Sequence, residues 1–155
     1  MRPSPGFRAF GVGFLAQSLC QFNRLHNNKN MPHISLEYSS NLHNLDESWV
    51  LLQVNKAVLS LGIFMDSDIK TRIHRLGSYR IGVSAAEAGD HAFVAATVDL
   101  LSGREFTIKE LLGQVLLKAL ERSCRDPLDS LQTQFTVHVR ELQSELYFKS
   151  VSKPV

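Results

Sequence analysis

Apolar and polar residues alternate over residues 33–38. The two sides of the alternation are Ile34, Leu36 and Tyr38 against His33, Ser35 and Glu37. Successive side chains of a β-strand point to opposite faces, so the pattern predicts a strand with one buried face. Residues 69–75 alternate in the same way, with Ile69, Thr71 and Ile73 against Lys70, Arg72 and His74. This segment is therefore a second predicted strand.

Between these strands the apolar period changes from two to that of a helix. Val50, Val54, Val58 and Leu61 recur at helical spacing, and Gly62 follows them. Residues 44–47 (Asn-Leu-Asp-Glu) have the form of a capping box, which predicts a helix start at that point. Gly62 predicts its end.

The same order of patterns returns in the second half. Residues 91–101 are almost continuously apolar, which predicts a central strand buried on both faces. Residues 107–110 (Thr-Ile-Lys-Glu) form a second capping box before an apolar stripe, and Pro127 lies beyond that stripe. The stripe consists of Ile108, Leu111, Leu112, Val115, Ala119 and Leu120. Residues 133–140 alternate again and predict a last strand.

These elements predict an α/β (α+β) fold of two consecutive β-α-β units. We expect a four-stranded mixed sheet with two helices on one face and parallel pairing within each unit. The glycine- and alanine-rich residues 77–89 are expected to connect the units as a loop. The polar sides of the other strands are not polar enough, and residues 91–101 are too apolar, for the uncovered face to be wholly solvated, which predicts self-association.

Composition fits one globular domain. The chain has 155 residues, of which 44% are hydrophobic and 21% are charged. No apolar run reaches the 18 or so residues of a membrane-spanning helix, so we expect no membrane partner. Two cysteines make neither a disulfide framework nor a zinc motif, so we expect no metal and a reducing, cytoplasmic location.

The positive charge is confined to residues 1–30. This segment carries four Lys and Arg and no acid, while residues 31–155 carry a net charge of −2. The main part of the chain therefore gives no electrostatic indication of nucleic-acid binding. We expect residues 1–30 to be disordered. They are either a targeting peptide or an upstream extension of a reading frame that starts at Met31, and we favour the second reading.

Common enzyme motifs for nucleotide binding, serine hydrolysis and zinc catalysis do not occur in the sequence. What remains is Met31-Pro32-His33, with a proline directly before a strand. Methionine is commonly removed before a small residue such as proline, which would expose Pro32 as a secondary amine. An amide nitrogen inside a chain is not basic, so Pro32 could act as a base only if the preceding residues were absent.

A set of short motifs, in order along residues 31–155, resembles the 5-carboxymethyl-2-hydroxymuconate isomerase family of the tautomerase superfamily. They are Met31-Pro32-His33, Glu37, Val54-Asn55, Gly62-Ile63-Phe64, residues 69–74, Ala92-Phe93-Val94, Gly103-Arg104 and Phe148-Lys149. The resemblance implies a tautomerase-like fold, a homotrimer, an amino-terminal proline as catalytic base and no cofactor. It also implies isomerisation of 5-carboxymethyl-2-hydroxymuconate to its 2-oxo tautomer in the degradation of homoprotocatechuate, an aromatic compound.

The resemblance assigns roles to individual residues. Pro32 matches the catalytic proline, and Arg104 matches an arginine that binds a substrate carboxylate. A second family arginine falls at Lys70, while Arg72 matches a further arginine of the pattern. Lysine keeps the charge but loses the planar fork that holds a carboxylate at two points.

Two alternatives stay open. The substitution at Lys70 is compatible with a related tautomerase that acts on another dienol acid. If residues 1–30 are retained and block Pro32, the protein would be a non-catalytic trimeric binding protein. Without the resemblance, Pro32 is an ordinary strand-boundary residue, Arg104 a turn residue, and Lys70 and Arg72 solvated strand residues.

Overall fold

A computed structural model describes residues 31–83, 90–124 and 131–152 of the chain. The predictions for residues 1–30 and for Pro127 fall outside these ranges. The elements are β1 (His33–Ser39), α2 (Glu47–Leu59), the 3-10 turn η1 (Asp66–Asp68), β2 (Lys70–Leu76), β3 (His91–Leu101), α3 (Phe106–Ser123), β4 (Gln132–Leu142) and the 3-10 turn η3 (Ser144–Leu146). No helix within these ranges is long and apolar enough to cross a bilayer.

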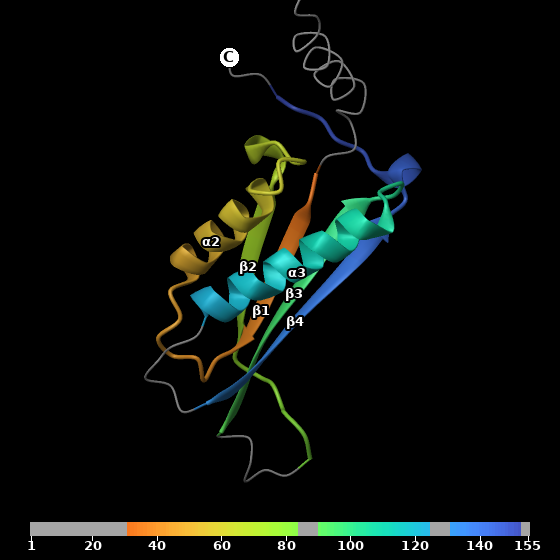
Figure 1. Cartoon of the computed structure of the whole chain (residues 1–155). Helices are drawn as coiled ribbons and strands as arrows, with labels where there is room; N and C mark the ends of the chain where they lie inside the picture. The colour runs from red at the N-terminus through yellow and green to blue at the C-terminus, as the bar shows by residue number, and fades with distance from the viewer. Residues whose placement is uncertain (1–30, 84–89, 125–130, 153–155) are drawn as a thin grey trace, which may run out of the picture.

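The four strands form one mixed sheet in the order β2-β1-β3-β4. β1 pairs in parallel with β2, and β3 pairs in parallel with β4, while the central strands β1 and β3 are antiparallel. Both helices cover the same face of the sheet (Figure 1). The predicted pair of β-α-β units, with two helices on one face of a mixed sheet, is confirmed.

The core lies between the helices and the sheet. Each helix contributes three fully buried side chains four residues apart: Val50, Val54 and Val58 in α2, and Leu112, Leu116 and Leu120 in α3. The stripe predicted for α3 is correct at Leu112 and Leu120 but wrong at Leu111, which is 45% exposed. Leu116 is buried instead, because it lies four residues from both Leu112 and Leu120, and this spacing keeps side chains on one helix face.

Neither predicted capping box is formed. α2 begins at Glu47, and its cap is Asp46, whose carboxylate accepts from the backbone N–H of Trp49 at 3.0 Å. Glu47 is instead engaged by Tyr38, whose hydroxyl donates to Oε1 at 2.6 Å. α3 begins at Phe106 after Glu105, which makes no side-chain cap, so Thr107 lies inside the first turn.

The uncovered face of the sheet differs from the expectation. Alternation directs His33, Ser35 and Glu37 of β1 and Lys70, Arg72 and His74 of β2 to this face. Along β3, alternate residues Ala92–Val98 are fully buried, but Phe93, Ala95 and Thr97 are only half-buried. The predictions of an apolar open face and of a strand buried along both faces are therefore wrong, because polar residues of neighbouring strands flank β3 on that side.

Candidate active site

Pro32 lies at the end of the sheet where β1 and β2 begin. Its side chain is fully buried, and its carbonyl accepts the backbone N–H of Lys70 at 3.1 Å. This bond continues the parallel ladder of β1 and β2 one residue before β1 starts. The sheet thereby fixes the position of Pro32. In this chain its nitrogen forms the amide bond to Met31.

Lys70 and Arg72 lie beside the first residues of β1. Register places Lys70 opposite His33 and Arg72 opposite Ser35, and both cations are exposed on the open face. The ammonium of Lys70 donates to the carbonyl of Ser67 at 2.7 Å. The prediction that Lys70 and Arg72 lie on the same face of their strand is correct. The register places both residues beside β1, the strand that follows Pro32.

Arg104 approaches the same end of the sheet from β3. Asp99 of β3 is in register with His33, so residues 100–104 run beyond the start of β1. Gly103, with φ +96°, turns the chain in the left-handed region that favours glycine. The guanidinium of Arg104 then stacks 4.8 Å above the ring of Phe64, in the segment that leads to β2. Burial lowers the pKa of Arg104 from its ordinary value.

A row of polar side chains, one from each strand, crosses the open face of the sheet next to Pro32. Register aligns Lys70, His33, Asp99 and Arg140 across the four strands. Arg140 binds both carboxylate oxygens of Asp99, with Nε–Oδ1 at 2.8 Å and Nη2–Oδ2 at 3.1 Å. This hydrogen-bonded pairing raises the pKa of Arg140. The carboxylate of Asp99 is thereby held at the β4 side, while the β2 side carries the cations.

His33 lies between these charges. Burial lowers its pKa below the ordinary value, and the positive charges of Arg72 and Lys70 lower it further, while Asp99 acts in the opposite direction. His33 is therefore favoured in its neutral form at neutral pH. Apart from its place in the Met-Pro-His motif, no sequence pattern points to His33 as a site residue.

The segment after β4 returns across this end of the sheet (Figure 1). Tyr147 places its hydroxyl 3.3 Å from Nε2 of His33 and 3.5 Å from Sδ of Met31. Two residues later, Lys149 forms an ion pair with Asp68 of η1 at 3.2 Å. Tyr147 was missed in the sequence, because its partners lie more than a hundred residues away along the chain.

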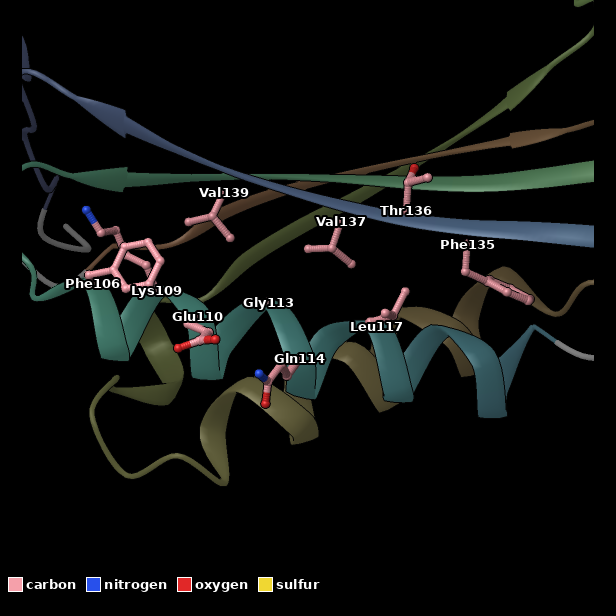
Figure 2. Close-up of a pocket in the computed structure, with 10 residues that line it drawn as sticks. All are labelled: Phe106, Lys109, Glu110, Gly113, Gln114, Leu117, Phe135, Thr136, Val137 and Val139. Atoms are coloured by element: carbon pink, nitrogen blue, oxygen red, sulfur yellow. The ribbon is translucent and has the colours of Figure 1, made fainter.

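A separate groove of about 600 Å³ lies between α3 and β4 (Figure 2). Its apolar surface comes from Leu117 of α3 and from Phe135, Val137 and Val139 of β4, with Glu110 and Gln114 among its polar lining residues. None of the four predicted site residues lines it. The groove follows the outer edge of the sheet and is distinct from the group around Pro32.

The paired β-α-β units on one mixed sheet and a family match together define the class as a tautomerase-superfamily protein. A family model described as 5-carboxymethyl-2-hydroxymuconate isomerase matches residues 32–152. The chain belongs to this isomerase family. Its match starts at Pro32.

Solved structures agree in fold. A 5-carboxymethyl-2-hydroxymuconate isomerase from Deinococcus radiodurans R1 is 24% identical with a TM-score of 0.72, over 80% of this chain and 92% of that one. A 5-carboxymethyl-2-hydroxymuconate delta-isomerase is 20% identical with a TM-score of 0.71, over 82% and 92%. A "fused 4-OT wild type symmetric trimer" is 19% identical with a TM-score of 0.56, over 72% and 85%. No curated protein sequence matches the chain.

Proposed function

We propose that this protein converts 5-carboxymethyl-2-hydroxymuconate to its 2-oxo tautomer, with Pro32 as the proton-transferring base, in homoprotocatechuate degradation. The observation that carries the proposal is a family match that begins at Pro32 and extends over the described domain. Pro32 takes the proton of the 2-hydroxyl group, the double bonds shift along the chain, and the proton is delivered to the distant carbon. No redox partner is needed, because the step only relocates a proton and an electron pair.

The surroundings of Pro32 suit an amine base. Burial and neighbouring positive charges both disfavour the protonated form of an amine, which moves a free proline nitrogen toward the working pH. Pro32 is buried, and Lys70 and Arg72 lie on the adjoining strand. The proline ring and the ladder bond from Lys70 hold the nitrogen in a fixed direction.

This mechanism requires that the functional protein start at Pro32. Residues 32–155 include all helices and strands of the described structure. In the proposal residues 1–30 are an upstream extension or a leader, and Met31 is removed after it has served as the first residue. The active enzyme is then a cytoplasmic homotrimer. Because the open face of the sheet is polar, support for the trimer comes from the family and from the trimeric relative, not from an apolar patch.

In this proposal Arg104, together with Lys70 or Arg72, binds the carboxylates of the substrate. Arg104 is half-buried and its guanidinium lies over the Phe64 ring, a contact that limits the freedom lost when it binds a substrate. Lys70 and Arg72 supply a second positive region on the open face. These cations would hold the carboxylates and stabilise the enolate-like charge as it develops.

The lysine at position 70 supports a second candidate function, that of a related tautomerase that acts on a different dienol acid. The lysine binds a carboxylate through a single charged group, whereas an arginine would bind it through two N–H groups of a planar guanidinium. A panel of dienol mono-, di- and tricarboxylates would rank the substrates by kcat/KM. Preference for 5-carboxymethyl-2-hydroxymuconate supports the first candidate, and preference for another dienol acid supports the second.

The decisive experiment compares the full-length chain with a form expressed from Met31 and processed to Pro32. General acid–base catalysis contributes about 10²- to 10⁴-fold, so the processed form should be faster by that factor. Intact mass spectrometry verifies each amino terminus. A processed form extended by one glycine before Pro32 is the matched control and should be as slow as the full chain.

Equal turnover by the full-length protein, with residues 1–31 shown to be attached, would contradict the role of Pro32. It would leave the non-catalytic binding protein or a different base as the explanation. Light scattering on the processed form tests the assembly, where a trimer is expected and a monomer at micromolar concentration would refute it.

A further inference from the structure

Tyr147 contacts the residues on both sides of Pro32. Its hydroxyl lies 3.5 Å from Sδ of Met31 and 3.3 Å from Nε2 of His33. The rings of Tyr147 and His33 meet edge to face, with centroids 6.1 Å apart and planes at 79°. The ion pair of Lys149 with Asp68 anchors the segment two residues further on. Tyr147 is therefore held in place by contacts on its ring, its hydroxyl and its backbone segment.

The phenol oxygen of Tyr147 has two contacts, to Met31 and to His33, that its single proton and the proton of His33 have to satisfy. A tyrosine hydroxyl has one proton to donate, and here it is directed to Sδ of Met31. When the phenol proton is directed to Sδ, the contact with His33 is a hydrogen bond only in the tautomer that carries a proton on Nε2. The neutral form of His33 meets this requirement with its proton on Nε2, so His33 holds the phenol oxygen and leaves the phenol proton for another acceptor.

Removal of Met31 changes the partner of this phenol. The side chain of Met31 is almost wholly buried, and its residue is bonded directly to the nitrogen of Pro32. In the form that starts at Pro32, the space of Met31 therefore opens beside the base. The phenol proton that pointed to the sulfur then points into that space. A sulfur atom is a weak acceptor, so an oxygen placed there would accept more strongly.

We propose that Tyr147 is a catalytic hydrogen-bond donor that binds the 2-oxygen of the substrate. This inference rests on the proposed function of Pro32. As Pro32 removes the proton from the 2-hydroxyl group, negative charge builds on that oxygen, and the phenol of Tyr147 donates to it without transferring its proton. The pair of Pro32 and Tyr147 would then recognise 2-hydroxy and 2-oxo acids, and His33 would position the phenol.

The test separates binding of the 2-oxygen from turnover. Processed wild-type protein, Tyr147→Phe and Tyr79→Phe are each titrated with 2-oxoadipate and with adipate, which differ only in the 2-oxo oxygen. Tyr79 is the matched control, because its ring packs on Phe93 at 5.9 Å rather than on the residues beside Pro32. Circular dichroism confirms that each variant is folded.

We expect wild type and Tyr79→Phe to bind 2-oxoadipate about 3- to 10-fold more tightly than adipate, as a hydrogen bond to a neutral acceptor gives. Tyr147→Phe should lose this preference while its affinity for adipate stays within about twofold. With the dienol substrate, kcat of Tyr147→Phe should fall about 10- to 100-fold, because the same bond strengthens as charge develops.

Two results would overturn the inference. One is a wild-type protein that does not prefer 2-oxoadipate, and the other is equal weakening of both ligands in Tyr147→Phe, which indicates a structural role only. A Tyr147-dependent preference in a protein that isomerises no dienol acid would uphold the binding role and refute the proposed function instead. The full-length chain should show no preference, since Met31 still occupies the position.

Discussion

The layer between helices and sheet and the end of the sheet around Pro32 follow opposite rules. The layer is built from aliphatic side chains such as Val54, Val98 and Leu116, all fully buried. The Pro32 end combines polar and charged groups from β1, β2 and β3 and the segment after β4, most of them partly exposed. A change in the layer should alter folding free energy, and a change at the Pro32 end should alter chemistry. The following predictions test how cleanly these effects separate.

Leu116→Ala should lower the free energy of unfolding by about 2–5 kcal/mol, because it leaves a cavity at a fully buried position. Urea denaturation measures the loss. Turnover per folded molecule should stay unchanged. Leu111→Ala on the same helix is the control, and its loss should be much smaller because Leu111 is 45% exposed. An equal loss at both positions would contradict the assignment of the buried stripe.

Arg104→Ala should reduce kcat/KM at least about 30-fold, since breaking a charge-assisted carboxylate contact costs roughly 2–5 kcal/mol. Steady-state kinetics on the processed form measures it. Arg75→Ala is the control, because Arg75 lies near the other end of β2 and donates to the carbonyl of Ser40 at 2.8 Å. If Arg104→Ala matches the wild type, Arg104 is only a turn residue and the substrate assignment fails with it.

Lys70→Arg should preserve turnover of 5-carboxymethyl-2-hydroxymuconate or raise it a few-fold. It restores the fork that can hold a carboxylate at two points. Lys56→Arg on the exposed surface of α2 serves as the control for a general effect of arginine. A drop in turnover at Lys70→Arg alone, with retained activity on another dienol acid, would show that lysine is selected for that other substrate.

Gly113→Ala should raise the free energy of unfolding by about 0.5–1 kcal/mol, the usual gain of alanine over glycine inside a helix. The added Cβ would meet Cγ2 of Val139 at 3.7 Å, an ordinary contact. Thermal unfolding checks the sign. Gly62→Ala makes the contrast, because Gly62 has φ +69° and the substitution should destabilise. A loss at Gly113 would mean that α3 and β4 are packed more closely.

His33 should give the smallest effect, a pH dependence of stability. Its pKa is lowered in the folded protein from an ordinary value of 6.5, chiefly by burial. The unfolded chain therefore binds the proton more readily, and the contribution of neutral His33, complete above pH 6.5, is lost as the pH falls below it. Between pH 7.5 and 5.5, wild type should lose more stability than His33→Asn. His74→Asn on the same open face should follow the wild type.

Much of the fold was predictable because the spacing of apolar residues along the chain shows which side chains are buried. The spacing of Val50, Val54 and Val58 and the alternation in residues 33–38 both follow from one covered face. The capping boxes were predicted wrongly, because Asp46 caps α2 and α3 already begins at Phe106, before Thr107. Glu47 accepts from Tyr38, a contact between two elements that local sequence does not reveal. The open face is more polar than predicted, because Lys70, Arg72 and His74 of β2 are exposed on it beside the partly buried strand β3.

The candidate site was predictable only as far as the family motif extends. The family motif supplied all four predicted site residues, Pro32, Lys70, Arg72 and Arg104. The pairing of β1 with β2 and β3 explains why the segments that carry them lie at the same end of the sheet. Tyr147 could not be found, because its position depends on the return of the chain after β4. Its neighbours Phe148 and Lys149 belonged to the motif, which was the one available hint.

The start of the described domain and the segment that follows β4 both lie at the Pro32 end of the sheet, which determines where a purification tag can be attached. A purification tag before Pro32 would acylate the proposed base, and one after residue 152 would continue a segment that already contacts His33 and η1. Residues 77–90 join β2 to β3 and follow Leu76, which is in register with Ser39 at the opposite end of β1. That end is about 23 Å from Pro32, at about 3.3 Å per residue along β1. A tag inserted in this connection would leave both termini native.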